Sequence, residues 1–261
     1  MITSTQNPKI KWLHALQSQA RQRREDGAFI IEGVRLAEEA LAGGWNARLV
    51  VYTEDLNARG QAVVAGFATR GAAIEQVSSS VLRFASDTET PQGLLVVLDW
   101  QAARLPEHLD FVFIPDKLRD PGNLGTMLRT AAAAGVQAVF LPPETTDAFA
   151  PKVLRAAMGA HFHLPIQPLG WDEIASAIQG MNIYLASAGE GLPYTQADLK
   201  APLALIVGGE AEGASSQASA LSTARVRIPM PGGSESLNAA VAAGVLMFEV
   251  LRQRSSQKEV P

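Results

Sequence analysis

Two short runs of uninterrupted apolar residues most constrain the fold of this chain. Residues 111–114 (Phe-Val-Phe-Ile) and 203–207 (Leu-Ala-Leu-Ile-Val) contain no polar side chain. Such runs are typical of strands that are buried on both faces of a sheet. Each is followed by a glycine-containing turn and then by a helical pattern, so the sequence predicts a layered α/β fold.

The same alternation of strands and helices divides the chain into two units. In the first, strands are expected at residues 29–31, 48–52, 73–77 and 94–98, with helices between them. Residues 99–109 lose this periodicity and are interpreted as a linker. We therefore expect one domain at residues 1–100 and a second at residues 108–261, a division that 261 residues readily allow.

Composition excludes several classes of protein. A net charge of −4 means that any surface for nucleic acid must be local. The absence of cysteine excludes disulfides, thiolate metal sites and cysteine nucleophiles. His161 and His163 have no third ligand nearby, so no metal is expected. The polar N-terminus and the short apolar run 239–248 predict no signal peptide and no membrane span, and we expect a cytoplasmic protein.

The N-terminal stretch 8–24 is basic. It contains Lys9, Lys11, Arg21, Arg23 and Arg24 without any acidic residue. Trp12 and His14 lie among these cations, and the apolar spacing predicts a short amphipathic helix. The stretch is either a solvated helix face or an arm that contacts RNA phosphates while an aromatic ring stacks on a base.

A turn at residues 120–123 precedes a helix that is expected to run to Ala134. Asn123 can cap this helix, and Arg129 lies less than two turns further along, so its side chain can point back toward the helix N-terminus. Together these residues suit a polyanion or a reacting oxygen. The alternative is a capping asparagine and an ordinary surface arginine.

The apolar strand 203–207 runs directly into Gly208, Gly209 and Glu210. A strand, a glycine-rich turn and a helix form a ligand-binding edge in open α/β sheets. The glycine spacing is neither the dinucleotide fingerprint nor a phosphate-binding loop. Glu210 is therefore either a residue that holds a polar ligand group or a solvent-exposed acid of the turn.

The last helix is expected over residues 236–254, after the turn 231–233. Ser234 and Ser236 are plausible N-caps, and Asn238 lies beside them. A helix N-terminus of this composition favours an anionic or electron-rich ligand, although a plain turn before a core helix is the alternative. A repeat of apolar or glycine residues predicts one buried helix face, formed by Leu237, Val241, Gly244, Val245, Phe248 and Leu251.

Three of these stretches together resemble the three motifs of the SpoU (TrmH-like) RNA ribose 2′-O-methyltransferases. They are residues 120–125 with Arg129, residues 208–213, and residues 228–230 with residues 236–238. The resemblance covers about residues 110–254. The N-terminal part is similar to the L30e-like substrate-binding domain that often accompanies this family, at residues 5–9, 29–33 and 90–93. Two departures are mild, namely Gly209 where asparagine or serine is usual and Ala239 where valine is common.

The resemblance implies a parallel-sheet catalytic domain whose C-terminal segment forms a trefoil knot. It also implies a homodimer with the active site at the subunit interface. The implied cofactor is S-adenosylmethionine. The positions that would bind it are Leu185, Ala186, Ser187, Val207, Gly208, Ile228, Met230 and Leu237.

In the family pattern Arg129 helps to activate the ribose hydroxyl. A guanidinium is always protonated, so stabilising the developing alkoxide or pairing with a phosphate is physically easier than acting as a base. The residues that would orient Arg129, cofactor and nucleotide are Asn123, Glu210, Ser236 and Asn238. We expect a structured RNA as substrate, ribosomal rather than transfer RNA. Transfer RNA is the alternative substrate. The alternative functions are a non-catalytic RNA-binding module and a nucleotide-binding oxidoreductase, and the absence of the dinucleotide fingerprint counts against the oxidoreductase.

Overall fold

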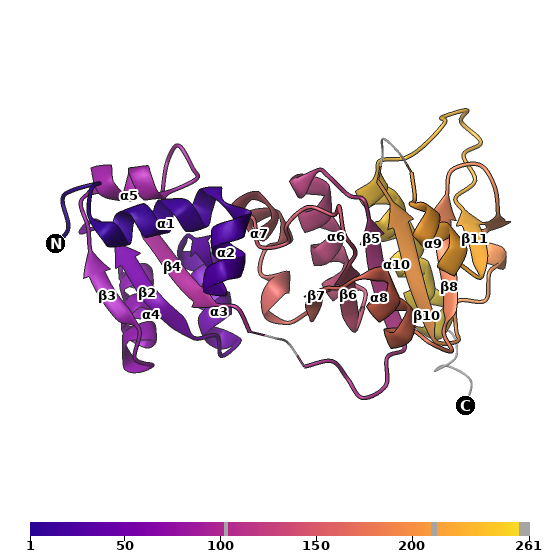
Figure 1. The fold of residues 1–261 in the computed structure, drawn as a ribbon, viewed down its shortest axis with the longest axis horizontal. Helices are drawn as coiled ribbons and strands as arrows, with labels where there is room; N and C mark the ends of the chain where they lie inside the picture. Colours follow the sequence, from indigo (N-terminus) through magenta and orange to yellow (C-terminus); the bar gives the residue numbers. More distant parts are fainter. Residues whose placement is uncertain (102–103, 210–212, 256–261) are drawn as a thin grey trace. The chain divides into compact units, whose positions relative to one another are not determined.

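A computed structural model describes residues 1–101, 104–209 and 213–255 (Figure 1). The chain forms two compact units. The first comprises residues 1–101 together with residues 149–162, and the second comprises the other described residues. The boundaries expected from the sequence do not include the 149–162 segment in the first unit.

The first unit is built on a four-stranded sheet in the order β1-β4-β2-β3. Its strands are β1 (Ala28–Glu32), β2 (Ala47–Tyr52), β3 (Ala73–Gln76) and β4 (Leu94–Asp99). Pairing is antiparallel on both sides of β4 and parallel between β2 and β3. The helices are α1 (Pro8–Ser18), α2 (Ala20–Asp26), α3 (Val34–Ala42), α4 (Ala58–Thr69), α5 (Ser79–Ala85) and α7 (Pro151–Ala157), with a 3-10 turn η1 (Ala160–Phe162).

Helices α1 and α5 cover one face of this sheet. Ile10, Leu13 and Leu16 are fully buried there against the strands, as their spacing predicts. The predicted basic helix nevertheless divides at Gln19, whose extended backbone ends α1 and begins α2. Asn7 caps α1 by accepting a hydrogen bond from the Lys9 N–H at 2.9 Å.

The 149–162 segment belongs to the core of the first unit. The Phe149 ring lies 4.9 Å from that of Phe29 and 4.4 Å from that of Trp100. The Phe162 ring packs edge-on against Trp45 at 5.5 Å, and the Trp45 indole N–H donates to the Phe162 carbonyl. The segment thus adds an aromatic layer to a sheet whose strands all lie before residue 100.

The second unit contains a seven-stranded sheet in the order β7-β6-β5-β10-β8-β11-β9. All the pairings between these strands are parallel. The strands are β5 (Phe111–Asp116), β6 (Ala138–Leu141), β7 (Ile166–Pro168), β8 (Asn182–Ser187), β9 (Leu192–Pro193), β10 (Leu203–Gly208) and β11 (Ala224–Arg227). The two apolar runs of the sequence are β5 and β10, which lie side by side at the centre.

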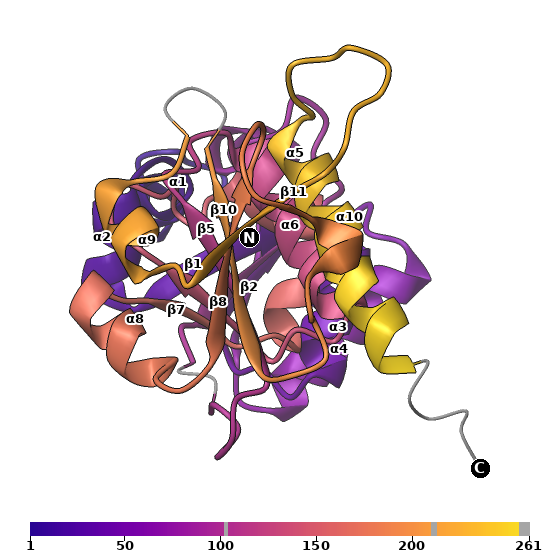
Figure 2. The ribbon, with the colours of Figure 1, turned by 90° about the vertical axis from the view of Figure 1, so that its right-hand side faces the viewer.

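Helices cover both faces of this sheet, as expected for strands without polar residues. They are α6 (Pro121–Ala133), α8 (Trp171–Ala177), α9 (Ser216–Leu221) and α10 (Ala239–Ser255), with a 3-10 turn η2 (Tyr194–Gln196). Figure 2 shows α8 and α9 on one side of the central strands and α6 and α10 on the other. No helix in the described part of the chain is long and apolar enough to cross a membrane.

The expectation for the buried face of the last helix is wrong within a single chain. Val241 is 54% exposed, Phe248 46% and Leu251 39%. The buried apolar residues are instead Ala239, Ala240, Ala243, Leu246, Met247 and Val250, and Glu249 and Gln253 are buried with them. Both faces of α10 are apolar, so periodicity alone could not select one, and the small alanines allow close packing on the unit.

We predict that Phe149→Ala destabilises the first unit by about 3–5 kcal/mol, because it empties a buried ring site among other rings. Chemical denaturation followed by tryptophan fluorescence measures this, since Trp12, Trp45 and Trp100 all lie in the first unit. Met158→Ala, at an exposed position of the same segment, is the control and is expected to cost less than about 1 kcal/mol. Equal stability of the two variants would show that the segment does not contribute to the core.

Candidate active site

A pocket of about 820 Å³, measured out to its open mouth, lies in the second unit at the ends of β8, β10 and β11. Most of the expected cofactor positions line it: Ala186, Ser187, Val207, Gly208, Ile228, Met230 and Leu237. Ser236 lines it too. Leu185 does not, because its side chain is buried in the sheet core with Ile183 and Ile206.

The Gly208–Gly209 turn forms a wall of this pocket and is tightly enclosed by backbone. A Cβ at Gly208 would lie 2.6 Å from the Ala214 nitrogen, and one at Gly209 would lie 2.5 Å from the Lys117 carbonyl oxygen. Neither position accepts a side chain without movement of main chain. Glycine at 209, which departs from the usual family residue, is therefore required by this chain's own packing.

Asp116 is a site residue that the sequence analysis missed. It ends β5, is fully buried and pairs in register with Gly208. Its Oδ2 accepts a hydrogen bond of 2.5 Å from the Ser215 N–H, and the Ser215 hydroxyl in turn caps α9. The other oxygen, Oδ1, accepts no hydrogen bond from the described residues. An acid at the end of an otherwise apolar strand is the signal that could have identified it.

The capping residues of the two motif helices differ from those expected. Asp120 caps α6, because Pro121 already occupies its first turn, and the Asp120 carboxyl accepts from the Asn123 N–H at 2.7 Å. Asn238 caps α10 by accepting from the N–H groups of Ala240 and Val241 at 2.9 and 3.2 Å. Asn123 thus lies within the first turn of α6, and Ser234 and Ser236 lie before the cap of α10.

Asn123 and Asn238 are hydrogen-bonded to each other. The Asn238 side-chain amide donates to the Asn123 Oδ1 at 3.1 Å, which joins the N-termini of α6 and α10 beside the pocket. Arg129 lies on the same helix as Asn123 and is exposed. Within the described residues, no hydrogen bond or ion pair holds its guanidinium. Glu210 lies outside the described residues.

The structure separates the predicted basic arm into different groups. Arg23 is buried and donates to the carbonyls of Leu16 and Gln17 at 2.6 and 3.1 Å, so it closes the α1–α2 corner instead of facing RNA. Lys9 pairs with Glu75, and Arg21 pairs with Glu25.

The remaining members of the arm, Lys11 and Arg24, are exposed. Trp12 donates its indole N–H to Asp26 at 2.5 Å. This bond, together with one from Gln22, holds the pKa of the Asp26 carboxyl below its ordinary value. The indole is therefore committed to a contact inside the unit.

Comparison with known proteins identifies the family. Residues 110–248 match the SpoU rRNA Methylase family, and residues 7–96 match the MRM3-like substrate binding domain. The chain belongs to the SpoU family. It is 33% identical to the 23S rRNA (guanosine(2553)-2′-O)-methyltransferase RlmP of Bacillus subtilis, over 95% of this chain and 98% of that protein.

Solved structures of RNA methyltransferases are similar over nearly the whole chain. An AdoMet-bound rRNA methyltransferase from Sinorhizobium meliloti superposes with a TM-score of 0.86 at 31% identity, covering 96% of this chain and 97% of that one. The SpoU methyltransferase AviRb of Streptomyces viridochromogenes, in complex with AdoMet, gives 0.87 at 26% identity, covering 96% and 99%. The expected α/β fold, a parallel-sheet SpoU domain with a smaller N-terminal substrate-binding domain, is confirmed. The threading of the knot stays a prediction.

We predict that Asp116→Ala weakens binding of S-adenosylmethionine to this SpoU protein about tenfold. The reason is that Gly213 and Ala214, which line the pocket, lose the anchor that Asp116 provides through the adjacent Ser215 N–H. Asp116→Asn keeps an acceptor for the Ser215 N–H and is expected to bind within about threefold of wild type. Titration calorimetry with S-adenosylmethionine measures both variants, and thermal unfolding controls for the fold. Wild-type affinity in the alanine variant would contradict the anchoring role.

Proposed function

We propose that this protein transfers a methyl group from S-adenosylmethionine to a ribose 2′-hydroxyl of ribosomal RNA. The observation that carries the proposal is the Asn123–Asn238 hydrogen bond, which brings the first and third motifs together beside the pocket. Membership of the SpoU family and the names of its full-length relatives support the same reaction.

The pocket fits the expected cofactor. Its walls combine small residues, which leave backbone accessible, with apolar side chains such as Val207, Ile228 and Met230. Such a lining suits a ligand with a flat apolar ring and a few polar groups that main chain can recognise. When bound, S-adenosylmethionine supplies an activated methyl group on a sulfonium, so the protein itself needs no metal or covalent nucleophile.

The protein's task is then to place the ribose oxygen in line with the methyl group and to help it lose its proton. We assign to Arg129 the stabilisation of charge on that oxygen or on the neighbouring phosphate, since a guanidinium is a fixed cation with several donors. Asn123 and Asn238 hold the two helix N-termini in place. Ser236 at the pocket orients the nucleotide, and Glu210 is assigned the same role by its motif.

Ribosomal RNA is the substrate we propose, because RlmP is named for methylation of 23S rRNA and matches nearly the whole of this chain. The MRM3-like substrate binding domain at residues 7–96 gives the protein a second RNA surface besides the pocket. A ribosomal substrate is also the reason to propose a cytoplasmic location.

We further propose a homodimer in which α10 packs against the partner. Leu237, just before the helix, and Val241, Phe248 and Leu251 on it follow one another at steps of four, seven and three residues, and all are exposed in the single chain. An exposed apolar helix stripe beside a pocket is typical of an interface that completes a site. The partner subunit would cover this stripe and border the pocket.

We predict that Arg129→Ala lowers the rate of methyl transfer about 10²- to 10³-fold while leaving S-adenosylmethionine affinity unchanged. The assay follows labelled methyl groups into ribose 2′-oxygens of unmodified ribosomal RNA and, separately, transfer RNA. Arg225→Ala, which removes an exposed arginine that pairs with Glu190 in the same unit, is the control. Full activity of Arg129→Ala would exclude the role, and cofactor binding without any labelled RNA in the wild type would favour a non-catalytic RNA-binding module.

We predict that Val241→Asp combined with Phe248→Asp converts the dimer to a monomer, since two charges would be buried in an apolar contact. Light scattering after size exclusion measures the mass, and methyl transfer is expected to fall with dissociation. Leu192→Asp places the same charge at another exposed apolar position of the second unit and should leave the mass unchanged. A wild-type protein that is already monomeric would rule out the dimer.

A further inference from the structure

An exposed pair of aromatic rings lies where α1 meets α5 in the first unit. Phe84, near the end of α5, is 41% exposed, and its ring stacks on that of His14 of α1 at 4.8 Å between centroids and an interplanar angle of 25°. His14 Nδ1 lies 3.2 Å from the Phe84 carbonyl oxygen, which fixes the ring beside α5. The pair is thus held in place and still presents an open ring surface to solvent.

Two cations flank these rings. Lys11 lies one turn before His14 on the exposed side of α1, and Arg83 directly precedes Phe84. Among the described residues, no hydrogen bond or ion pair holds either charged group. By contrast, Lys9, Arg48 and Arg59 of the same unit are each paired with a carboxylate.

The nearest acid after α5 is already engaged. Asp87 pairs with Arg155 at 2.9 Å, so it does not neutralise Arg83. Glu32 accepts hydrogen bonds from the hydroxyls of Ser86 and Thr88. The surface at the α1–α5 junction is therefore cationic and aromatic, because the carboxylates of Asp87 and Glu32 are bonded to other groups.

We propose that this junction, formed by Lys11, His14, Arg83 and Phe84, binds one unpaired nucleotide of the RNA substrate. The base stacks on the open face of the aromatic pair, and the two cations contact the phosphates on either side. The proposal rests on the proposed function and deepens it, because it names the surface of the substrate-binding domain that holds the RNA.

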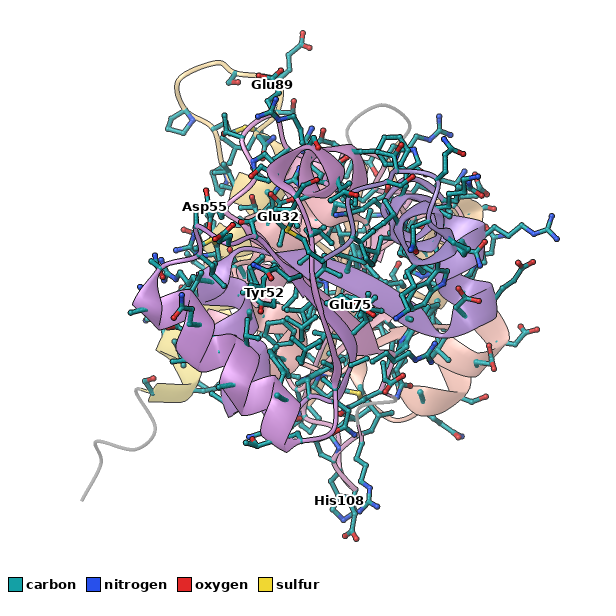
Figure 3. The ribbon with its side chains drawn as sticks, turned by 90° about the vertical axis from the view of Figure 1, so that its left-hand side faces the viewer. Glu32, Tyr52, Asp55, Glu75, Glu89 and His108 are labelled. Carbon is teal, nitrogen blue, oxygen red and sulfur yellow. The ribbon has the colours of Figure 1, made fainter. Side chains whose placement is uncertain are left out.

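The other candidate surface of this unit is less suited to RNA. A polar pocket formed by the 53–57 and 89–93 loops contains Asp55 and Glu89 as well as Arg83. Figure 3 shows Glu89 at the top of the view, with Asp55 and Glu32 below it in the upper half. Two exposed carboxylates repel phosphate, so Arg83 is better placed to serve RNA at the junction than within that pocket.

The structure also explains why the other aromatic of the basic arm is not the stacking residue. Trp12 is half-buried, and its indole N–H is bonded to Asp26. Its side chain packs against the hydrophobic core of the unit, which leaves less ring surface for an RNA base. Phe84 carries no such constraint, although nothing in the local sequence around it distinguishes it from a core phenylalanine.

The test uses the full-length protein and a short labelled single-stranded RNA oligonucleotide, with the same sequence as a duplex for comparison. Phe84→Ala is expected to weaken single-strand binding about tenfold and to change duplex binding little, because only an unpaired base can stack. Phe84→Tyr keeps a ring at the same place and should restore wild-type affinity. Met158→Ala removes an exposed apolar side chain elsewhere in the unit and is the matched control.

The cations give a second, independent measurement. Lys11→Ala with Arg83→Ala should reduce the slope of log affinity against log salt by about 1.4, the value for two phosphate contacts on a single strand. Arg70→Ala removes an exposed arginine elsewhere in the unit and should leave the slope unchanged in comparison. Unfolding followed by the fluorescence of Trp12, Trp45 and Trp100, which all lie in the first unit, controls for the fold of that unit in every variant.

Wild-type single-strand affinity in Phe84→Ala, or equal weakening by Phe84→Ala and Phe84→Tyr, would overturn the proposal. So would failure of the wild-type protein to bind the oligonucleotide. The proposed function is tested separately by methyl transfer from wild type to ribosomal RNA. Its failure alone would leave an RNA-binding junction without the reaction, whereas failure of the junction alone would leave an active enzyme with another RNA surface.

Discussion

The hydrogen bond between Asn238 and Asn123 joins two helices that are 115 residues apart in sequence, and the geometry of the pocket depends on it. Asn238 uses its carbonyl oxygen to cap α10 and its amide group to contact α6, so one side chain performs both tasks. Because α10 lines the pocket with Ala239, Ala242 and Leu246, a shift of this cap would move the pocket wall. Arg129 lies on α6, which the same hydrogen bond restrains. The bond therefore also helps to fix the position of the Arg129 helix relative to the pocket.

The fold could be predicted from the sequence wherever a helix has one clearly apolar face or a strand is apolar throughout. Strands β5 and β10 and the buried side of α1 were predicted correctly for this reason. The last helix was not, because alanines on one face and larger apolar residues on the other give no contrast from which to choose. The choice depends on which face the small residues allow to approach α6 and β10, and that is a property of the tertiary structure.

The candidate site was less accessible to sequence reasoning than the fold. The family resemblance led to most of the pocket lining, but it could not show that Leu185 faces the core. Nor could the sequence show that the Arg23 guanidinium donates to two backbone carbonyls. Asp116 was missed although it is an acid at the end of an otherwise apolar strand, and Phe84 was missed because it looks ordinary in its local sequence. Their significance comes from what lies across from them, namely the Ser215 N–H for one and the His14 ring for the other.

The 149–162 segment has a consequence for how the chain is made. The rings of Phe149 and Phe162 complete an aromatic layer whose other members, Phe29, Trp45 and Trp100, are synthesised much earlier. A growing chain therefore cannot finish its first unit when residue 101 leaves the ribosome, but must wait until residue 162 has emerged, by which time β5 and β6 are already exposed. The order of synthesis and the order of domain completion are therefore interleaved in this chain.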